Sequence, residues 1–463
     1  MKSAMGFFLV LIAASSTLHG QQQTTTTELT LPQAVAYALE HSPDLKSAVA
    51  ETTKRQGNVT TARSALLPEL DVAGDLGRSR LQHGYPSGAP PSILRFAQTT
   101  YSGSADLHML AWDFQKSQLE LDATRERLSA AKILTDRSRQ ELVFQVAQFY
   151  LEALTYEDLL RSAALTRKSL SSLLDRTNEL VKAGRAVPVD AFKIQTQLAQ
   201  IDSDSASLEA GRQAALSSLA ATMGYQGQLP ALKYSPASGT TPAASMDQQQ
   251  LLQTAQQQRP DLKAAMFDTK SAEDLERAAR RAYWPRIDFR ATAIQYGAQN
   301  PIGFQTLIGR LLPSLQVPSG STPGAVNDWT LGVHIGVPLF DSGRRSGQIK
   351  AAKAQAEQAH LAHSKTSLNV AREVQTSYAE MQSAQARVKA MQEAVVQSEE
   401  ILKNEQTKYE VGRTVINFVL EAEAGVLNSQ SLLLQAQRSE AIASLALKLA
   451  TGQIQTDSPG MNP

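Results

Sequence analysis

One long segment occurs twice in the chain, and this duplication restricts the possible folds more than any other feature of the sequence. The segment from Asp113 to Gly224 recurs without a gap from Asp341 to Gly452. An earlier part of the chain repeats at a smaller offset, which pairs Pro43 with Pro260. Because the offset grows from 217 (260 − 43) to 228 (341 − 113), the second copy carries an insertion before its Asp341. A repeat of about 200 residues is far longer than a solenoid unit, so a whole half-protein is duplicated.

The N-terminal part of the chain is predicted to be an export signal followed by a linker. Lys2 and the apolar run from Phe7 to Ala14 are typical of a secretory signal peptide, which we place at residues 1–20. That run is too short to cross a bilayer as a stable helix. Residues 21–30 are polar and are expected to form a flexible linker. The chain has no cysteine, which excludes disulfides and thiolate ligands, and its net charge of +1 predicts no nucleic-acid partner.

Four segments alternate apolar and polar residues, as strands with one apolar face do. They lie at 70–78, 101–111, 287–296 and 329–339. The last is about as long as a tilted strand that crosses a bilayer. The stretches at 81–99 and 297–328 are rich in Gly, Pro and Ser and are expected to be loops.

Long helices joined by tight turns fill most of each copy. Residues 114–183 contain no proline or glycine, and both they and residues 342–411 carry an apolar seam with steps of four and three. Gly184 and Gly412 are expected to end these helices, so that each forms a hairpin with the helix that follows. The chain then divides into a first repeat at 31–224, a linker at 225–245, a second repeat at 246–452 and a tail at 453–463. The seams are Leu142, Val146, Phe149, Ala153, Tyr156 and Leu160 in the first copy, and Val370, Val374, Ser377, Met381, Ala384, Val388, Met391 and Val395 in the second.

Four strands are too few to close a barrel, because the smallest membrane barrels have about eight. Open sheet edges are not tolerated in lipid, so several chains would have to pool their strands. The sequence leaves no linker between strand and helix at 112–114 or 340–342. We therefore expect a mainly α-helical fold with a membrane β-barrel that continues directly into a helical tube.

Several motifs, one of them present in both copies, make the chain resemble the TolC-like outer-membrane efflux protein family over nearly all of its length after the signal. They are Pro-Asp-Leu at 43–45 and 260–262, Leu-Leu-Pro-Glu-Leu at 66–70, Tyr-Trp-Pro-Arg-Ile at 283–287, Pro-Leu-Phe-Asp-Ser-Gly at 338–343, Tyr-Glu-Val-Gly-Arg-Thr at 409–414 and Val-Leu-Glu-Ala at 419–422. The resemblance implies a homotrimer with a twelve-stranded outer-membrane barrel on a long α-helical periplasmic tunnel. It also implies a passive exit duct for an inner-membrane pump, reached through a periplasmic adaptor protein, in tripartite efflux or type I secretion.

The resemblance further implies that the two hairpin tips contact the adaptor protein. The alternative is that the glycines at the tips only end helices, which needs no partner. The tip residues are Gly184, Arg185, Val187, Gly412, Arg413, Thr414 and Val415.

A pore gate is implied just past the second tip. Glu421 matches a carboxylate position at the tunnel mouth of the family, but Phe418 stands where another carboxylate is common, and its first-copy counterpart is Asp190. Three Glu421 side chains around a narrow axis would favour cations. Phe418 fits an apolar constriction instead, and a solvated glutamate on a helix face is the remaining interpretation of Glu421.

Lipid-facing strand residues are expected on the apolar faces of the alternating segments. They are Leu107, Met109, Trp329, Leu331, Val333, Ile335 and Val337, with His108 and His334 on the opposite face. His360 and His363 are three positions apart on a helix without a third ligand, so no metal site is expected.

No motif for a nucleophile, a phosphate or a cofactor is present, so neither a cofactor nor an enzyme activity is expected. An exported, soluble coiled-coil scaffold without transport activity is the alternative to a channel.

Overall fold

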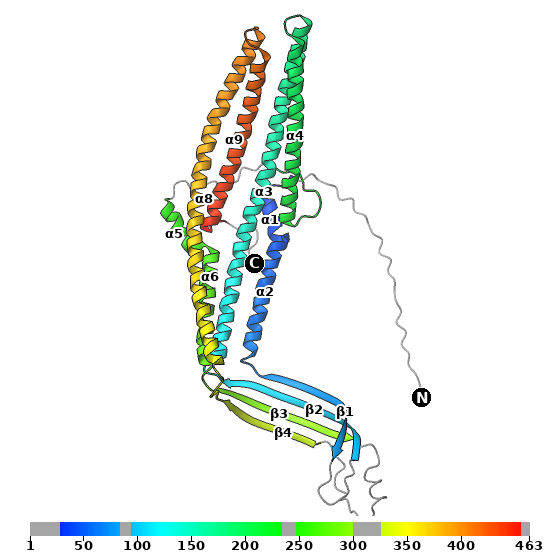
Figure 1. The fold of residues 1–463 in the computed structure, drawn as a ribbon, viewed down its shortest axis with the longest axis vertical. Helices are drawn as coiled ribbons and strands as arrows, with labels where there is room; N and C mark the ends of the chain where they lie inside the picture. Colours follow the sequence, from blue (N-terminus) through cyan, green and yellow to red (C-terminus); the bar gives the residue numbers. More distant parts are fainter. Residues whose placement is uncertain (1–27, 84–93, 234–246, 300–325, 455–463) are drawn as a thin grey trace, which may run out of the picture.

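The computed structural model describes residues 28–83, 94–233, 247–299 and 326–454. Helices form a long body, a four-stranded sheet extends from one end of it, and two hairpin tips form the other end (Figure 1). The predicted signal peptide at 1–20, and most of the segments predicted as linkers and tail at 21–30, 225–245 and 453–463, lie outside the described residues.

The helices repeat with the two offsets found in the sequence. Both ends of α1 and α2 recur in α5 and α6 at the offset that separates Pro43 from Pro260. Both ends of α3 and α4 recur in α8 and α9 at the offset that separates Asp113 from Asp341. The two long helices therefore have the same length, 67 residues each. The bounds are α1 Leu31–His41, α2 Pro43–Ser64, α3 Lys116–Lys182, α4 Pro188–Met223, α5 Gln248–Gln258, α6 Pro260–Arg281, α8 Arg344–Glu410 and α9 Ile416–Thr451.

Proline interrupts the first helical segment of each copy, as predicted. α2 and α6 begin at Pro43 and Pro260, where a proline fits the first turn, because its missing N–H would have no partner in the helix. The residues before the two prolines differ. Arg259 is only 2% exposed, and its guanidinium bonds Asp261 and Glu373. The hydroxyl of Ser42, its counterpart, is buried without a hydrogen-bond partner in the described part of the chain. Within the described ranges, the break at Pro260 is therefore held to the neighbouring helix α8 by side-chain bonds, and the break at Pro43 has no such bond from Ser42.

The predicted seams of the long helices are buried in part. In α3 the buried apolar residues include Leu142, Val146 and Ala153, but Tyr150 is buried in place of Phe149. Five of the eight predicted seam residues of α8 are buried, namely Val370, Val374, Met381, Ala384 and Val388. The seam of α3 drifts because an α-helix has about 3.6 residues per turn, whereas a strict heptad assumes about 3.5.

The strands form one antiparallel sheet in the order β1-β2-β3-β4 and are longer than most of the alternating segments. Their bounds are β1 Glu69–His83, β2 Leu94–Trp112, β3 Arg286–Gln299 and β4 Val326–Gly336. The predicted loops at 81–99 and 297–328 are wrong at their ends, because pairing continues from Leu81 to His83 and from Leu94 to Thr99. Backbone ladders do not require apolar alternation, which reports burial of one face rather than strand formation. Residues 84–93 and 300–325 lie outside the described part.

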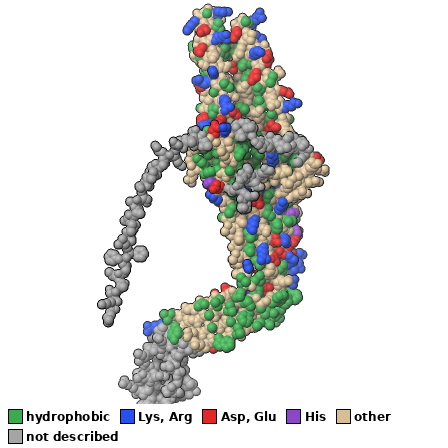
Figure 2. All heavy atoms as spheres, turned by 180° about the vertical axis from the view of Figure 1, so that it is seen from behind, with side chains coloured by type: hydrophobic (Ala, Val, Ile, Leu, Met, Phe, Trp, Pro, Cys, Tyr) green, Lys and Arg blue, Asp and Glu red, His purple; other side chains and the backbone are tan. Residues whose placement is uncertain are grey.

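The register of the sheet gives it one apolar and one polar face. Residues that are directly paired across antiparallel strands share a face. Leu107 pairs with Leu70 and Ala291, and Ala291 pairs with Leu331. The neighbouring polar row contains Asp71, Asp106, Thr292 and Thr330. Other apolar rows contain Met109, Phe289 and Val333, and Ala105, Ala293 and Trp329. Figure 2 shows hydrophobic side chains gathered over the sheet and the bend where it meets the helices.

The sheet continues into the helices through short turns, whereas the sequence predicted that strand and helix would meet without a linker. Phe114 and Gln115 lie between β2 and α3 and have φ angles of 56° and 67°. β4 ends at Gly336, so Val337, predicted as a strand residue, lies outside the strand. Pro338 follows it and has no N–H to donate to a strand ladder, which explains the earlier end.

Each strand is joined through such a turn to one helix of the long helical body. β1 follows α2, β2 precedes α3, β3 follows α6 and β4 precedes α8. These four helices pack in the order α2-α3-α6-α8, which is the order of their strands. The sheet and the lower helices are therefore two four-membered layers, one continuing the other.

Candidate functional site

The two hairpin tips share one backbone geometry. Gly184 and Gly412 have φ angles of 70° and 72°, in the left-handed region that favours glycine. The N–H of the residue after each glycine donates to a carbonyl five positions back, at 2.8 Å in both tips. Val187 and Val415 precede the return helices and are each 59% exposed. Arg185 and Arg413 are also exposed, so both tips present backbone, cations and apolar side chains to solvent.

The second tip has an additional polar support. Thr414 is partly exposed, and its hydroxyl lies 3.2 Å from a carboxylate oxygen of Glu405. The ammonium of Lys408 bonds the other oxygen at 2.6 Å. The Lys408 bond is the main reason that the pKa of Glu405 lies below its ordinary value.

Two contacts close to the tips connect the hairpins with each other. The guanidinium of Arg176 on α3 lies 2.6 Å from the carboxylate of Glu410 on α8. The hydroxyls of Thr177 and Tyr409 are 3.5 Å apart. An exposed ion pair stabilises a fold by only about 0–1 kcal/mol, so this connection can break at little cost.

The predicted gate residues are only partly brought together. Phe418 and Glu421 are both exposed and lie three positions apart on α9, which places them on one side of the helix. Asp190 lies on α4 and makes no side-chain hydrogen bond or ion pair to either within the described ranges. Their role as a gate stays a prediction.

Glu423 is a buried carboxylate that the sequence analysis missed. It is 4% exposed and lies on α9, where its Oε1 accepts hydrogen bonds from Ser169 of α3 at 2.7 Å and from Gln406 of α8 at 3.1 Å. No cation pairs with it in the part of the chain that the structure describes, and burial raises the pKa of its carboxyl. The sequence signal for this burial is the heptad spacing of Glu423 with Ile416, Val419 and Val426. All four residues are buried in the structure.

Glu423→Gln is expected to raise the melting temperature at neutral pH. A carboxyl whose folded pKa is raised stabilises the fold at low pH, and this contribution is lost as the pH rises through the folded pKa. The glutamine keeps an acceptor for Ser169 and removes the buried charge. Melting curves between about pH 8 and about pH 4 should show a difference that shrinks on acidification. The exposed Glu421→Gln is the matched control, and an equal gain in that variant would contradict the prediction.

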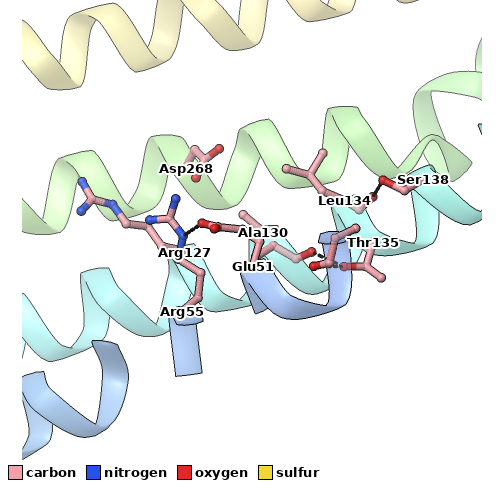
Figure 3. A pocket seen from close by; sticks show the side chains of 10 residues that line it. Glu51, Arg55, Arg127, Ala130, Leu134, Thr135, Ser138 and Asp268 are labelled. Atoms are coloured by element: carbon pink, nitrogen blue, oxygen red, sulfur yellow. Dashed lines mark hydrogen bonds and ion pairs between the residues drawn. The ribbon is translucent and has the colours of Figure 1, made fainter. Parts of the chain in front are cut away.

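One cavity of about 310 Å³ lies between α2, α3 and α6 (Figure 3). Arg55 donates to Glu51 at 2.8 Å, and Thr135 and Ser138 bond carbonyls of their own helix. Asp268 lies across the cavity with its pKa raised by burial. The hydroxyls are engaged in the helices, so neither is prepared as a nucleophile, and the cavity gives no catalytic arrangement.

Two of the candidate histidines lie close to carboxylates. His360 lies 3.0 Å from Glu273, and His108 lies 3.4 Å from Asp288 on the polar face of the sheet. His334 is paired opposite Asp288, so both strand histidines lie on the polar face, as predicted. The described residues contain no group of three or more His, Cys, Asp or Glu placed to hold a metal ion.

The apolar face of the sheet is exposed in the single chain. Trp329 is 78% exposed, and Leu331, Val333 and Ile335 are each more than half exposed, whereas Leu107 and Met109 are partly covered. No helix in the described segments has the length and apolar character needed to cross a membrane.

Comparison with known proteins identifies relatives of this chain. The family model described as outer membrane efflux protein matches residues 34–225 and 251–453. The outer membrane efflux protein BepC of Brucella suis is 24% identical over 97% of this chain and 92% of its own length. The outer membrane protein TolC of Vibrio cholerae is 23% identical over 90% of this chain and 89% of its own length.

Solved structures show the same fold. A structure of CusC superposes with a TM-score of 0.74 at 20% identity and covers 92% of each chain. The outer membrane protein VceC from Vibrio cholerae has a TM-score of 0.71 at 21% identity and covers 91% of this chain and 96% of its own.

Proposed function

Because the chain belongs to the outer membrane efflux protein family, we propose that three copies form the outer-membrane exit duct of a tripartite efflux pump or a type I secretion system. The observation that carries this proposal is the four-stranded sheet with one exposed apolar face and two open edges. The chain is a passive conduit, and the energy for transport comes from an inner-membrane pump. No chemical reaction is assigned to it.

The open edges support assembly from several copies. Within the described residues, β1 and β4 each have a partner strand on one side only. A strand edge in lipid leaves N–H and C=O groups without partners, so membrane sheets must close. Three copies of four strands would give a twelve-stranded barrel, which is in the size range of known membrane barrels. Homotrimers are the form known for the family.

The same order of strands and helices supports a continuous duct. Because α2, α3, α6 and α8 follow the order of their strands, closing the sheet would also close the helical layer above it. The polar face of the sheet would line the lumen, with Asp106, Thr292 and Thr330 in one row. The lipid-facing set is Leu107, Met109, Trp329, Leu331, Val333 and Ile335, whereas Val337 would lie at its border.

The tips are the proposed contact with a periplasmic adaptor protein. Their exposed valines and arginines and the left-handed glycines are available to another chain. Phe418 and Glu421 would narrow the tunnel mouth, with Phe418 as an apolar element and Glu421 as a charge that favours cations.

Purification of the full-length chain tests this proposal against a soluble scaffold. We expect the chain to fractionate with the outer membrane, to require detergent in solution, and to have a protein mass of three chains by light scattering. A monomer that stays dissolved without detergent would overturn the channel and favour the scaffold.

A further inference from the structure

Exposed apolar side chains mark the level at which the sheet meets the helices. Each of the four junctions carries one: Leu67 before β1, Trp112 at the end of β2, Trp284 before β3 and Phe340 before α8. All four are at least half exposed, and Trp112 and Trp284 both pack on Phe114. Aromatic residues, tryptophan above all, concentrate at the headgroup level of membrane proteins. The junctions therefore indicate where the membrane surface crosses the molecule.

Unpaired arginines lie at the same level. Arg63 is the second-last residue of α2, Arg281 the last of α6 and Arg344 the first of α8. Arg63 and Arg344 are exposed and Arg281 is partly exposed. Among the described residues, none of the three side chains makes a hydrogen bond or an ion pair. α3 begins with Lys116, so every helix that meets the sheet carries a cation at that end.

The helix dipole explains the cations on two of these four helices but not those on the other two. α2 and α6 end at the junction, and the C-terminus of a helix favours a cation. α3 and α8 begin there, and the N-terminus of a helix disfavours a cation. Arg344 and Lys116 are thus placed against the dipoles of their own helices. Lys116 lies 3.7 Å from the carboxylate of Glu120 on the same helix, whereas Arg344 has no such partner among the described residues. Arg344 therefore points to an anionic partner outside its helix.

The acidic residues at this level do not neutralise the arginines. Asp113 accepts a hydrogen bond from the N–H of Ser117, and Asp341 accepts from the N–H and guanidinium of Arg345. Glu69, at the start of β1, is exposed, but it is a single carboxylate against the three arginines. The surface directly above the apolar band therefore has a local excess of positive charge.

We propose that Arg63, Arg281 and Arg344 form a basic collar that binds the headgroups of anionic phospholipids in the leaflet nearer the helices. The collar rests on the proposed membrane location of the sheet. Guanidinium groups bind phosphate oxygens through two parallel hydrogen bonds, which suits them to this partner. With three copies in a ring, the collar would hold a belt of anionic lipid around the base of the helical body.

Lipid retention by the full-length trimer tests the collar. The protein is reconstituted into vesicles of phosphatidylcholine with one part in three of phosphatidylglycerol, extracted in detergent, and its bound lipid is quantified by mass spectrometry. We expect roughly fivefold or greater enrichment of phosphatidylglycerol for the wild type, and almost none for the variant R63Q/R281Q/R344Q. The variant K132Q/R372Q/R387Q, which removes three cations from the helical body, should behave as the wild type.

The outcomes separate the collar from the channel itself. Wild-type protein that inserts into the vesicles but retains both lipids equally would overturn the collar alone. Equal loss of enrichment in the helical-body variant would also overturn it, because net charge would then be the cause. Failure of the wild type to enter vesicles would contradict the membrane location. If the triple variant misfolds, the collar is tested on the wild type alone by its dependence on salt. The enrichment of phosphatidylglycerol should fall as salt is raised from about 0.05 M to about 0.5 M, because salt screens charge. An unchanged enrichment would contradict the collar.

Discussion

Arginine in place of Leu331 is expected to prevent stable insertion of the chain into the outer membrane. Leu331 lies at the middle of β4, on the apolar face, and is 59% exposed. An arginine on the lipid face near the bilayer midplane costs about 2–4 kcal/mol. Because a trimer carries the substitution three times, the cost is roughly 6–12 kcal/mol per assembly, comparable to the whole stability of a domain. We expect loss of the trimer mass by light scattering and loss of export.

Thr330→Arg provides the matched control one position away. Thr330 lies on the polar face, in the row that contains Thr292 and Asp106, so the same charge would enter the aqueous lumen. We expect trimer assembly to survive and only the conductance of the channel to change. Equal damage from both substitutions would show that the apolar face does not contact lipid.

Arg413→Glu is expected to abolish export while trimer assembly remains intact. Arg413 is exposed at the second tip, where its backbone N–H, rather than its side chain, completes the turn around Gly412. Reversal of its charge therefore leaves the tip geometry unchanged and alters only the surface offered to an adaptor. A rim charge acts mainly through association, and like charges across an interface cost several kcal/mol. Susceptibility of cells to exported toxic compounds should rise to that of a deletion strain.

Arg387→Glu is the control for this substitution, because Arg387 is an exposed cation on the body of α8. It should leave susceptibility at the wild-type level. Trimer mass and membrane fractionation are measured for both variants. Normal export by an assembled Arg413→Glu trimer would remove this arginine from the proposed adaptor contact.

Periodicity made most of the architecture predictable from the sequence. The helix break at Pro43, the hairpin ends at Gly184 and Gly412 and the alternating face around Leu331 follow from local rules on proline, glycine and side-chain period. The strand ends did not follow, because hydrogen bonding to a neighbouring strand extends beyond the alternating residues. Pro338 was the available sign that the last strand stops early, since proline cannot donate to a ladder.

Long-range contacts were not predictable by the same means. Ser169 and Glu423 are 254 residues apart in the sequence, and Arg176 and Glu410 are 234 apart, yet both pairs join the hairpins. The local sequence pattern does not indicate that α3 packs against α9. The burial of Glu423 could have been found from its heptad position, but its partners could not.

Equal helix lengths restrict how this protein can change in evolution. The two 67-residue helices bring both turns to a similar height above the sheet. Loss of two turns from one of them would lower its tip by about 10 Å relative to the other. A docking partner would then meet an uneven rim, with turns at two heights. Side chains of the two halves can therefore diverge freely, as Ser42 and Arg259 have done, whereas insertions and deletions in the long helices must occur in both halves together.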